Sequence, residues 1–438
     1  MSSTLQVGKP KVAIVGAGIA GLTLACLLQK AALPCMLFEA RAQHKIGHNY
    51  GIHLRKPSEI AVSTTQRSNG TLSLAQALDE IEAATNQAQS RSTQSSYSVN
   101  AGVDETFLAA DRDVRQYLIS RLEQAGFNIS WDHKVASVDK ASGDNEVRLS
   151  FENGHMDNFD VVVNASGLRN PISKTVKPIL LPYCTYNGSK RISLNDWDSD
   201  WQKFFQDEPS VEFEATPNGT PYFSLQRIKF SSPSTGKLER VEIRWTYSRA
   251  ARDEHDALYR PKRTPEESKN IPDRFYQEFV AALPEVLQQQ NRPNAAQVLK
   301  AFSLERLKAD RILHWHLRVQ PNFVSHTPED TGLILSIGDA AHGLPILKSN
   351  GAHIAMRDAH KTAQRLLRGS DARRGDEQST NGPAEDLVVY WQDTISAINR
   401  LRRIHAQPDL SRPELESLLG VSIPSQLQFV DSKTVSKF

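Results

Sequence analysis

The sequence predicts an α/β protein with a Rossmann-like parallel-sheet domain, an inserted antiparallel-sheet domain and a C-terminal helix. Three observations lead to this prediction. The β-branched run at 12–15 is followed at once by a glycine-rich turn and a helical run of Leu, Ala and Gln. Between about 180 and 319, polar and apolar residues alternate with period two, as in strands with one solvated face. After this region, "TGLILSIG" returns to a continuous apolar run, which is typical of a buried parallel strand.

The N-terminal segment has the order strand, tight turn, helix. Gly16, Gly18 and Gly21 follow the strand with the spacing GxGxxG. In such a turn the first glycine allows the bend, the second lets the backbone approach a pyrophosphate, and the third permits close packing of helix on strand. A second apolar run ends at Glu39, whose carboxylate is placed to accept hydrogen bonds from ribose and would repel a 2′-phosphate. The segment therefore predicts a dinucleotide site that does not hold NADP.

Composition narrows the classes of function. The chain has 52 basic and 50 acidic side chains mixed along its length, so no charged block would follow a nucleic-acid backbone. Its three cysteines, Cys26, Cys35 and Cys184, lack metal-site spacing, which predicts a reducing compartment and no metal. The first ten residues are too polar for a signal peptide, and no apolar run approaches the roughly 20 residues that span a bilayer. We expect a cytoplasmic protein without a membrane span, and nothing in the sequence sets its oligomeric state.

Breaks in the pattern divide the chain into regions. The segment 83–102 is rich in Ser, Gln, Asn and Thr, which is typical of a loop. A helix that starts in "DRDVRQYL" is expected to end at Gly126, and a last helix is expected in "LVVYWQDTISAINRLRRIHAQ". The expected regions are a nucleotide-binding domain at 1–180, a substrate-binding antiparallel-sheet domain at 181–320, a return of the first domain at 321–368, and a polar spacer with a C-terminal helical region at 369–438.

Two further segments complete a recognisable order of motifs. "DRDVRQYL" offers Arg112, and the apolar run Leu333–Ile337 ends in Gly338 and Asp339, an acid placed to bind a polyol. With the glycine turn, these motifs resemble the single-component FAD-dependent monooxygenases, the family of para-hydroxybenzoate hydroxylase. The resemblance covers most of the chain, although the middle region offers no matching motif. It implies an FAD-binding domain whose cofactor contacts come from Gly16, Gly18, Gly21, Glu39, Arg112, Asp339 and Gly351.

In this family the cofactor carries the chemistry. The resemblance implies that NADPH or NADH reduces FAD and that O2 adds at the flavin C4a atom. The hydroperoxide then hydroxylates or epoxidises a small organic substrate, such as an aromatic or secondary-metabolite-like molecule. The helix that begins near Gly351 would direct its positive end to the flavin, and Pro345 would lie against the ring. Catalytic residues stay unassigned, with Pro345, Lys348 and Arg244 as candidates.

The chain departs from the family pattern at two places. Residues 164–167 read "NASG" where the family has Gly-Ala-Asp-Gly, so Ser166 replaces the acid. In the flavin loop, Lys348 and Ser349 replace a glycine pair and His353 replaces an asparagine. Lys348 either stabilises anionic reduced flavin or points into solvent. Two other classes of function therefore stay open. One is a non-hydroxylating flavoenzyme (oxidase, dehydrogenase or FAD-supported cyclase), and the other is a flavin-binding protein without turnover.

The alternating strands hold the residues that would face a substrate. Arg244 and Arg227 are candidates to orient an acidic or phenolic group. Aromatic side chains on these strands either line a pocket or pack in the core, because one face of each strand is buried. The aromatic residues concerned are Phe213, Tyr222, Phe223, Trp245 and Tyr247.

Overall fold

The computed structural model describes most of the chain and confirms the predicted α/β fold class. The described residues are 9–45, 51–55, 106–140, 146–169, 172, 177–206, 208, 210–231, 238–264, 266–267, 270–289, 293–320, 334–347, 351–372, 383–423 and 427. The expected loop at 83–102 and the candidate Lys348 lie outside these residues, as does Ser349.

A five-stranded parallel sheet forms the nucleotide-binding half, with the strand order β17-β9-β1-β2-β5. The predicted strand, turn and helix at the N-terminus are confirmed. The strands are β1 (Val12–Val15), β2 (Cys35–Phe38), β5 (Ile129–Ser130), β9 (Val161–Asn164) and β17 (Ile334–Ser336).

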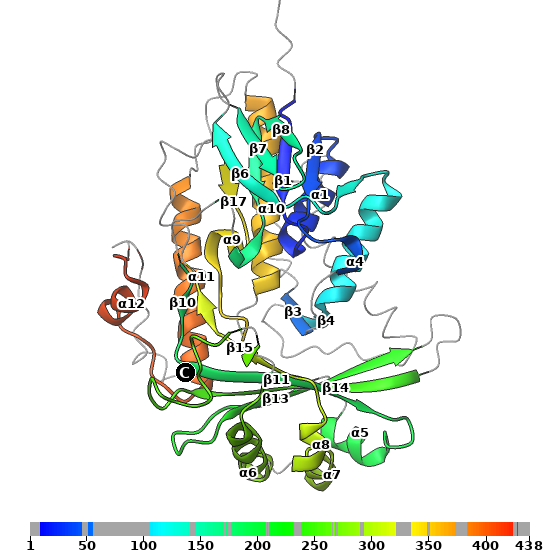
Figure 1. Ribbon diagram of the computed structural model, residues 1–438, viewed down its shortest axis with the longest axis vertical. Helices are drawn as coiled ribbons and strands as arrows, with labels where there is room; N and C mark the ends of the chain where they lie inside the picture. Colours follow the sequence, from blue (N-terminus) through cyan, green and yellow to red (C-terminus); the bar gives the residue numbers. More distant parts are fainter. Residues whose placement is uncertain are drawn as a thin grey trace, which may run out of the picture.

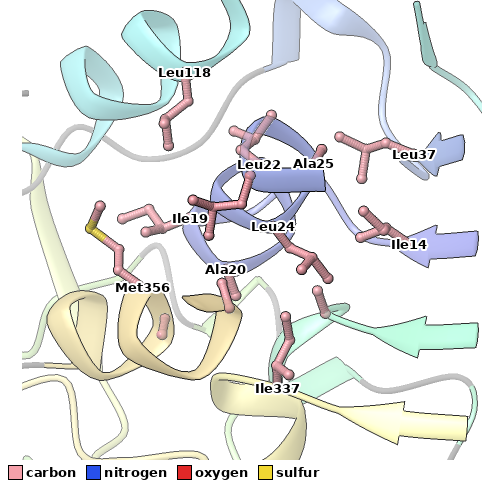
Figure 2. Packing of buried hydrophobic residues seen from close by; sticks show 14 of the residues in the cluster. Ile14, Ile19, Ala20, Leu22, Leu24, Ala25, Leu37, Leu118, Ile337 and Met356 are labelled. Atoms are coloured by element: carbon pink, nitrogen blue, oxygen red, sulfur yellow. The ribbon is translucent and has the colours of Figure 1, made fainter. Parts of the chain in front are cut away.

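Both faces of this sheet are buried, which explains its continuous apolar runs. One face packs on three helices, α1 (Ile19–Lys30), α4 (Asp111–Gln124) and α10 (Gly351–Ala372). Figure 2 shows side chains of α1 between Leu118 of α4, Met356 of α10 and Ile14 of β1. The other face packs on an antiparallel sheet of β6 (Val135–Lys140), β7 (Val147–Phe151) and β8 (Met156–Phe159).

The predicted antiparallel sheet is confirmed, with the strand order β12-β13-β14-β11-β15. For this region the sequence predicted strands and no helices, but four helices cover one face of the sheet (Figure 1). The strands are β11 (Tyr183–Ile192), β12 (Ser210–Phe213), β13 (Tyr222–Ser231), β14 (Leu238–Ala250) and β15 (Ile312–Trp315). The helices are α5 (Ser199–Phe205), α6 (Asp273–Gln289), α7 (Ala295–Ala301) and α8 (Leu304–Lys308).

Smaller elements connect the two halves. The hairpin of β3 (Gly51–Arg55) and β4 (Thr106–Ala110) lies between α4 and the antiparallel sheet (Figure 1). Short strands β10 (Ile179–Leu180) and β16 (Arg318–Val319) pair beside α11 (Pro383–Ile404). The remaining elements are two 3₁₀ turns, η1 (Gln43–Lys45) and η2 (Gly167–Arg169), and the helices α9 (Asp339–His342) and α12 (Arg412–Leu419).

The predicted last helix is confirmed as α11, whereas α12 was not expected. Its sequence nevertheless carries start and stop signals. Ser411 donates from its hydroxyl to Glu414 in a capping box, and Gly420 ends the helix in the left-handed conformation. None of the helices in the described part of the chain is long and apolar enough to cross a membrane.

Candidate cofactor and substrate site

In the turn between β1 and α1, close packing requires Gly16 and Gly21, whereas Gly18 has open space beside it. Gly16 has φ +110°, and a Cβ atom there would lie 2.5 Å from the carbonyl oxygen of Ala165. A Cβ atom at Gly21 would lie 1.9 Å from the carbonyl oxygen of Gly16. Gly18 is extended, with φ −78° and ψ −178°, and a Cβ atom there meets only the oxygen of Ala165, at 4.0 Å. Gly18 therefore borders open space.

The start of α1 offers free N–H groups to that space. The first N–H groups of a helix have no intrahelical partner, and the first helical bond here runs from Leu22 N to the oxygen of Gly18. No side chain caps the helix at Gly18, and the first turn carries no acid. A bare helix N-terminus of this kind favours an anionic group.

Glu39 lies at the end of β2 and points toward the same turn. It is 6% exposed. Its Oε2 accepts a hydrogen bond from the N–H of Ala17 at 2.8 Å, and its Oε1 accepts from the backbone N and the Nε of Arg41 at 3.1 and 3.0 Å. A small hollow beside it is lined by Ala17, Glu39, Arg41 and Arg115, among others. The carboxylate is thus held by its own chain at the rim of a hollow.

The structure brings Arg115 to this hollow and leaves Arg112 exposed on α4. Arg115 is 13% exposed, and its Nε lies 3.0 Å from the carboxylate of the fully buried Asp111. Sequence reasoning missed Arg115. The available signal was the spacing i, i+4, i+8, because Asp111, Arg115 and Ile119 share one helix face and Ile119 lines the same hollow.

Asp339 begins α9 at the carboxyl end of β17. A Cβ atom at Gly338 would lie 3.2 Å from the Cβ of Ala20 and 3.3 Å from that of Ala355, so α1 and α10 meet the chain here. Burial raises the pKa of Asp339 to about 6, while the nearby positive charges of His342 and Arg115 oppose the rise. Protein atoms thus surround the carboxylate, although the residue keeps an exposed surface.

A buried pair that the sequence did not predict supports the start of α9. Nε2 of His342 lies 2.7 Å from Oδ2 of Asp358, and both side chains are fully buried. The same oxygen accepts the N–H of Gly338 at 3.0 Å. The ring of Tyr390 in α11 stacks on His342 with the ring centres 4.2 Å apart. These contacts fix the turn that presents Asp339.

Ser166 follows β9, next to the glycine turn. Its hydroxyl donates to Oδ1 of Asn164 at 2.7 Å. The Nδ2 of Asn164 donates to the hydroxyl of Ser336 in β17 at 3.3 Å. Where the family pattern has an acid, this chain has a neutral polar link between two parallel strands.

The loop that was expected to face the flavin is only partly described. Pro345 is buried, and Ile346 is 43% exposed. Gly343 pairs with Gln320 through backbone hydrogen bonds of 2.8 and 3.0 Å. Gly351 begins α10 as predicted and is half-buried. The expected roles of Pro345 and Gly351 stay predictions.

The antiparallel sheet separates the substrate candidates between its two faces. Trp245 belongs to the core that the helices α5–α8 cover, and Arg227 lies on that same face, 5.5 Å above the ring of Phe205. Arg244 projects from the other face. It is 7% exposed, donates from Nε to Glu242 at 3.0 Å, and lies within electrostatic reach of Asp113 on α4.

The guanidinium of Arg244 is only partly satisfied. Its Nη1 and Nη2 are buried without a hydrogen-bond partner in the described part of the chain. The predicted aromatic candidates pack in cores. Tyr222 packs against residues of α11. The other four pack in the core beneath the helices α5–α8: Phe213, Phe223, Trp245 and Tyr247.

Known proteins resemble this chain over most of its length. Residues 14–55 match the family described as NAD(P)-binding Rossmann-like domain. The chain is 26% identical to the FAD-dependent monooxygenase aptC of Emericella nidulans, over 92% of this chain and 95% of that protein. It is 24% identical to the FAD-dependent monooxygenase nscC of Aspergillus fumigatus, over 90% and 93%.

Solved structures show the same fold. A putative FAD-containing monooxygenase from Photorhabdus luminescens superposes with a TM-score of 0.59 at 18% identity, covering 91% of this chain and 98% of that one. The 2,6-dihydroxypyridine-3-hydroxylase from Arthrobacter nicotinovorans superposes with 0.53 at 14% identity, covering 96% and 95%. The Diels-Alderase PyrE3 superposes with a TM-score of 0.53 at 13% identity, covering 93% of this chain and 76% of that one.

Proposed function

The chain belongs to the family of FAD-dependent monooxygenases, and from this premise we propose that it hydroxylates or epoxidises a small, electron-rich organic molecule. Its cofactor is FAD, and NAD(P)H is the reductant typical of the family. When bound and reduced, FAD supplies the activation of O2 that lets one oxygen atom reach the substrate. A secondary-metabolite-like, aromatic substrate is proposed, and the name of one protein of the same fold, 2,6-dihydroxypyridine-3-hydroxylase, supports the aromatic class.

The residues around the glycine turn fit FAD. Gly18 leaves room for the pyrophosphate in front of the uncapped start of α1. Glu39 would accept hydrogen bonds from ribose, and Asp339 would accept them from the ribityl chain. Arg115 lines the hollow beside Glu39, lies within electrostatic reach of Asp339, and would neutralise phosphate charge. The meeting of the glycine turn, the end of β2 and Arg115 of α4 at one hollow is the observation that carries the proposal.

Arg244 supports the substrate class. A buried guanidinium with two unsatisfied nitrogens favours an anionic or phenolic oxygen, because an Arg side chain presents its donors as a planar fork. Arg244 lies within electrostatic reach of Asp113 in α4, a helix of the nucleotide-binding half. The hairpin β3–β4 lies between that helix and the antiparallel sheet (Figure 1). Arg244 would therefore bind and orient a phenol or an aromatic acid.

Substrate-dependent turnover tests the proposal. FAD-loaded protein is assayed against phenols and aromatic acids for NADPH oxidation, oxygen uptake and a product that carries one atom from labelled O2. Arg244→Gln should raise KM for an acidic substrate by about ten- to a hundredfold. The control Arg227→Gln removes the same charge from the helix face and should leave KM unchanged. Oxygen uptake that yields only hydrogen peroxide with every substrate would contradict hydroxylation.

The neutral Ser166 favours one alternative, a non-hydroxylating flavoenzyme such as an oxidase, dehydrogenase or FAD-supported cyclase. Anaerobic stopped-flow reduction by NADPH and by NADH separates the two functions. Ser166→Asp restores the family residue and should be reduced at least as fast as the wild type. A variant that loses reduction would show that Ser166 has a role of its own. If neither protein is reduced with any substrate, the alternative is favoured.

A further inference from the structure

Five cationic or potentially cationic side chains gather at the β15 edge of the antiparallel sheet, and we call them the edge cluster. They come from the segment after β14, from β15 and the residue after it, and from β16. The strand β15 ends the strand order on this side. The members of the edge cluster are Arg260, Arg263, His314, His316 and Arg318.

The members contact one another directly. Nη1 of Arg263 lies 2.7 Å from Nδ1 of His314 and also contacts Nε2 of His316. Nη2 of Arg263 donates to the carbonyl oxygen of His314 at 2.6 Å. Nη2 of Arg318 lies 3.3 Å from Nδ1 of His316, so two guanidiniums approach one imidazole. A neutral imidazole accepts a hydrogen bond at only one nitrogen. The edge cluster therefore holds more hydrogen-bond donors than its own side chains can accept.

The positive charge of the edge cluster has little compensation. Burial and the neighbouring arginines lower the pKa of Arg263 to about 10 and that of His316 to about 4. Glu267 is within electrostatic reach of Arg260, but its carboxylate is exposed and bound to the N–H of Thr264 at 2.7 Å. No other carboxylate perturbs these pKa values in the described part of the chain.

The edge cluster also has unused donors. Nε of Arg260, Nε of Arg318 and Nε2 of His314 are buried and have no hydrogen-bond partner among the described residues. His314 is itself 5% exposed and stacks on Tyr186 with the ring centres 4.5 Å apart. Buried donors without acceptors are rare in folded proteins, because they forfeit their bonds to water. An anion would satisfy them.

We propose that the edge cluster binds an oxyanion of the phosphate class. Guanidinium groups bind phosphate oxygens through paired donors. The edge cluster contains three guanidinium groups, and among the described residues no carboxylate is bound between them. Free phosphate or sulfate is one source of such a group, and a phosphate of the nicotinamide dinucleotide is the other. Arg318 lies two residues before Gln320, which pairs with Gly343 of the loop after Asp339. The site goes beyond the proposed monooxygenase function and does not depend on it.

Sulfate is the first probe, because it stays a dianion throughout the pH range of the test. The FAD-loaded protein is titrated with sulfate by calorimetry at an ionic strength held constant with chloride. Binding should strengthen as the pH falls from about 8 to 5, because a bound anion raises the pKa of His316 and the complex takes up a proton. The groups that face this histidine are the ring of His314, with the ring centres 5.2 Å apart, and the positive charges of Arg260, Arg263 and Arg318.

Variants locate the site. Arg318→Gln should weaken sulfate binding by about tenfold or more, and Arg263→Gln should do the same. The control Arg311→Gln removes one exposed charge just before β15 and should change nothing. If Arg263→Gln fails to fold, Arg318→Gln decides the matter. Sulfate that binds no better than chloride, or that binds Arg318→Gln as well as the wild type, would overturn the proposal.

A second arm identifies the source of the anion. NADP⁺ and NAD⁺ differ only in the 2′-phosphate. If Arg318→Gln weakens NADP⁺ alone, the edge cluster binds that phosphate, and if it weakens both, the edge cluster binds the shared pyrophosphate. If it weakens sulfate and neither dinucleotide, the natural occupant is a free oxyanion. Because sulfate binding requires no turnover, failure of the monooxygenase proposal would leave this result standing.

Discussion

Replacing Gly18 with alanine should weaken FAD binding without unfolding the protein. The backbone at Gly18 is extended, a conformation that any residue adopts, and an added Cβ would meet nothing closer than 4.0 Å. In Gly21→Ala, by contrast, the new Cβ would lie 1.9 Å from the oxygen of Gly16. The two variants make the same chemical change three residues apart, one in open space and one in a packed contact.

The expected magnitudes follow from these distances. In Gly18→Ala, loss of glycine at the helix N-cap lowers the free energy of unfolding by about 0.5–1 kcal/mol. The reduced conformational entropy of the unfolded chain raises it by about 0.4–1 kcal/mol. The free energy of unfolding should thus change by less than about 1 kcal/mol. If the methyl group breaks one charged hydrogen bond to phosphate, worth about 1.5–3 kcal/mol, FAD affinity falls roughly ten- to a hundredfold. Gly18→Val places a branched side chain there and should abolish FAD retention.

The assay measures cofactor and fold separately. FAD affinity is taken from fluorescence titration of the apoprotein, and stability from urea unfolding of the same apoprotein. Gly18→Ala should keep the unfolding midpoint and lose affinity, while Gly21→Ala should lose stability outright. The reasoning would be refuted by a stable Gly18→Ala protein whose FAD affinity lies within twofold of the wild type.

Three further predictions concern named side chains. Arg115→Gln should weaken FAD in the same titration, whereas Arg112→Gln, on the exposed side of α4, should not; the reverse result would restore Arg112 as the cofactor arginine. Glu39→Ala and Asp339→Ala should each weaken FAD about ten- to a hundredfold without unfolding the chain, and a residue whose variant binds normally loses its assignment. Burial lowers the pKa of His405 to about 4, below its unfolded value of 6.5, so the unfolded state takes up the proton first and stability falls as pH drops from 6.5 to 4. His405→Gln should therefore lose up to about 3 kcal/mol less stability than the wild type when urea unfolding is compared across that range, and equal losses would contradict the assignment.

The sequence predicted the nucleotide half well because its signals are local. Each of these elements is determined by residues within or beside it. This holds for the turn of Gly16 and Gly21, the strand that ends before Glu39 and the strand before Asp339. The sequence could not show which arginine lies beside Glu39, because Arg112 and Arg115 are about one helical turn apart and only packing decides which of them reaches the hollow. The helices α5–α8 were not predicted, because the period-two alternation of the neighbouring strands indicates a sheet throughout that region.

The two faces of β14 illustrate a further limit of sequence reasoning. Period two predicts that Trp245 and Arg244 project to opposite faces, but it does not say which face meets the nucleotide-binding half. Packing decides this: the ring of Trp245 lies so close to Gly188 that a Cβ there would be 2.5 Å away, and such large aromatic rings need an apolar layer over them. The helices α5–α8 provide that layer over Trp245, whereas α11 packs on the other face at Tyr183 and Tyr222. Arg244 shares this second face, so we expect substrate-orienting residues on β14 at the positions that alternate with Trp245.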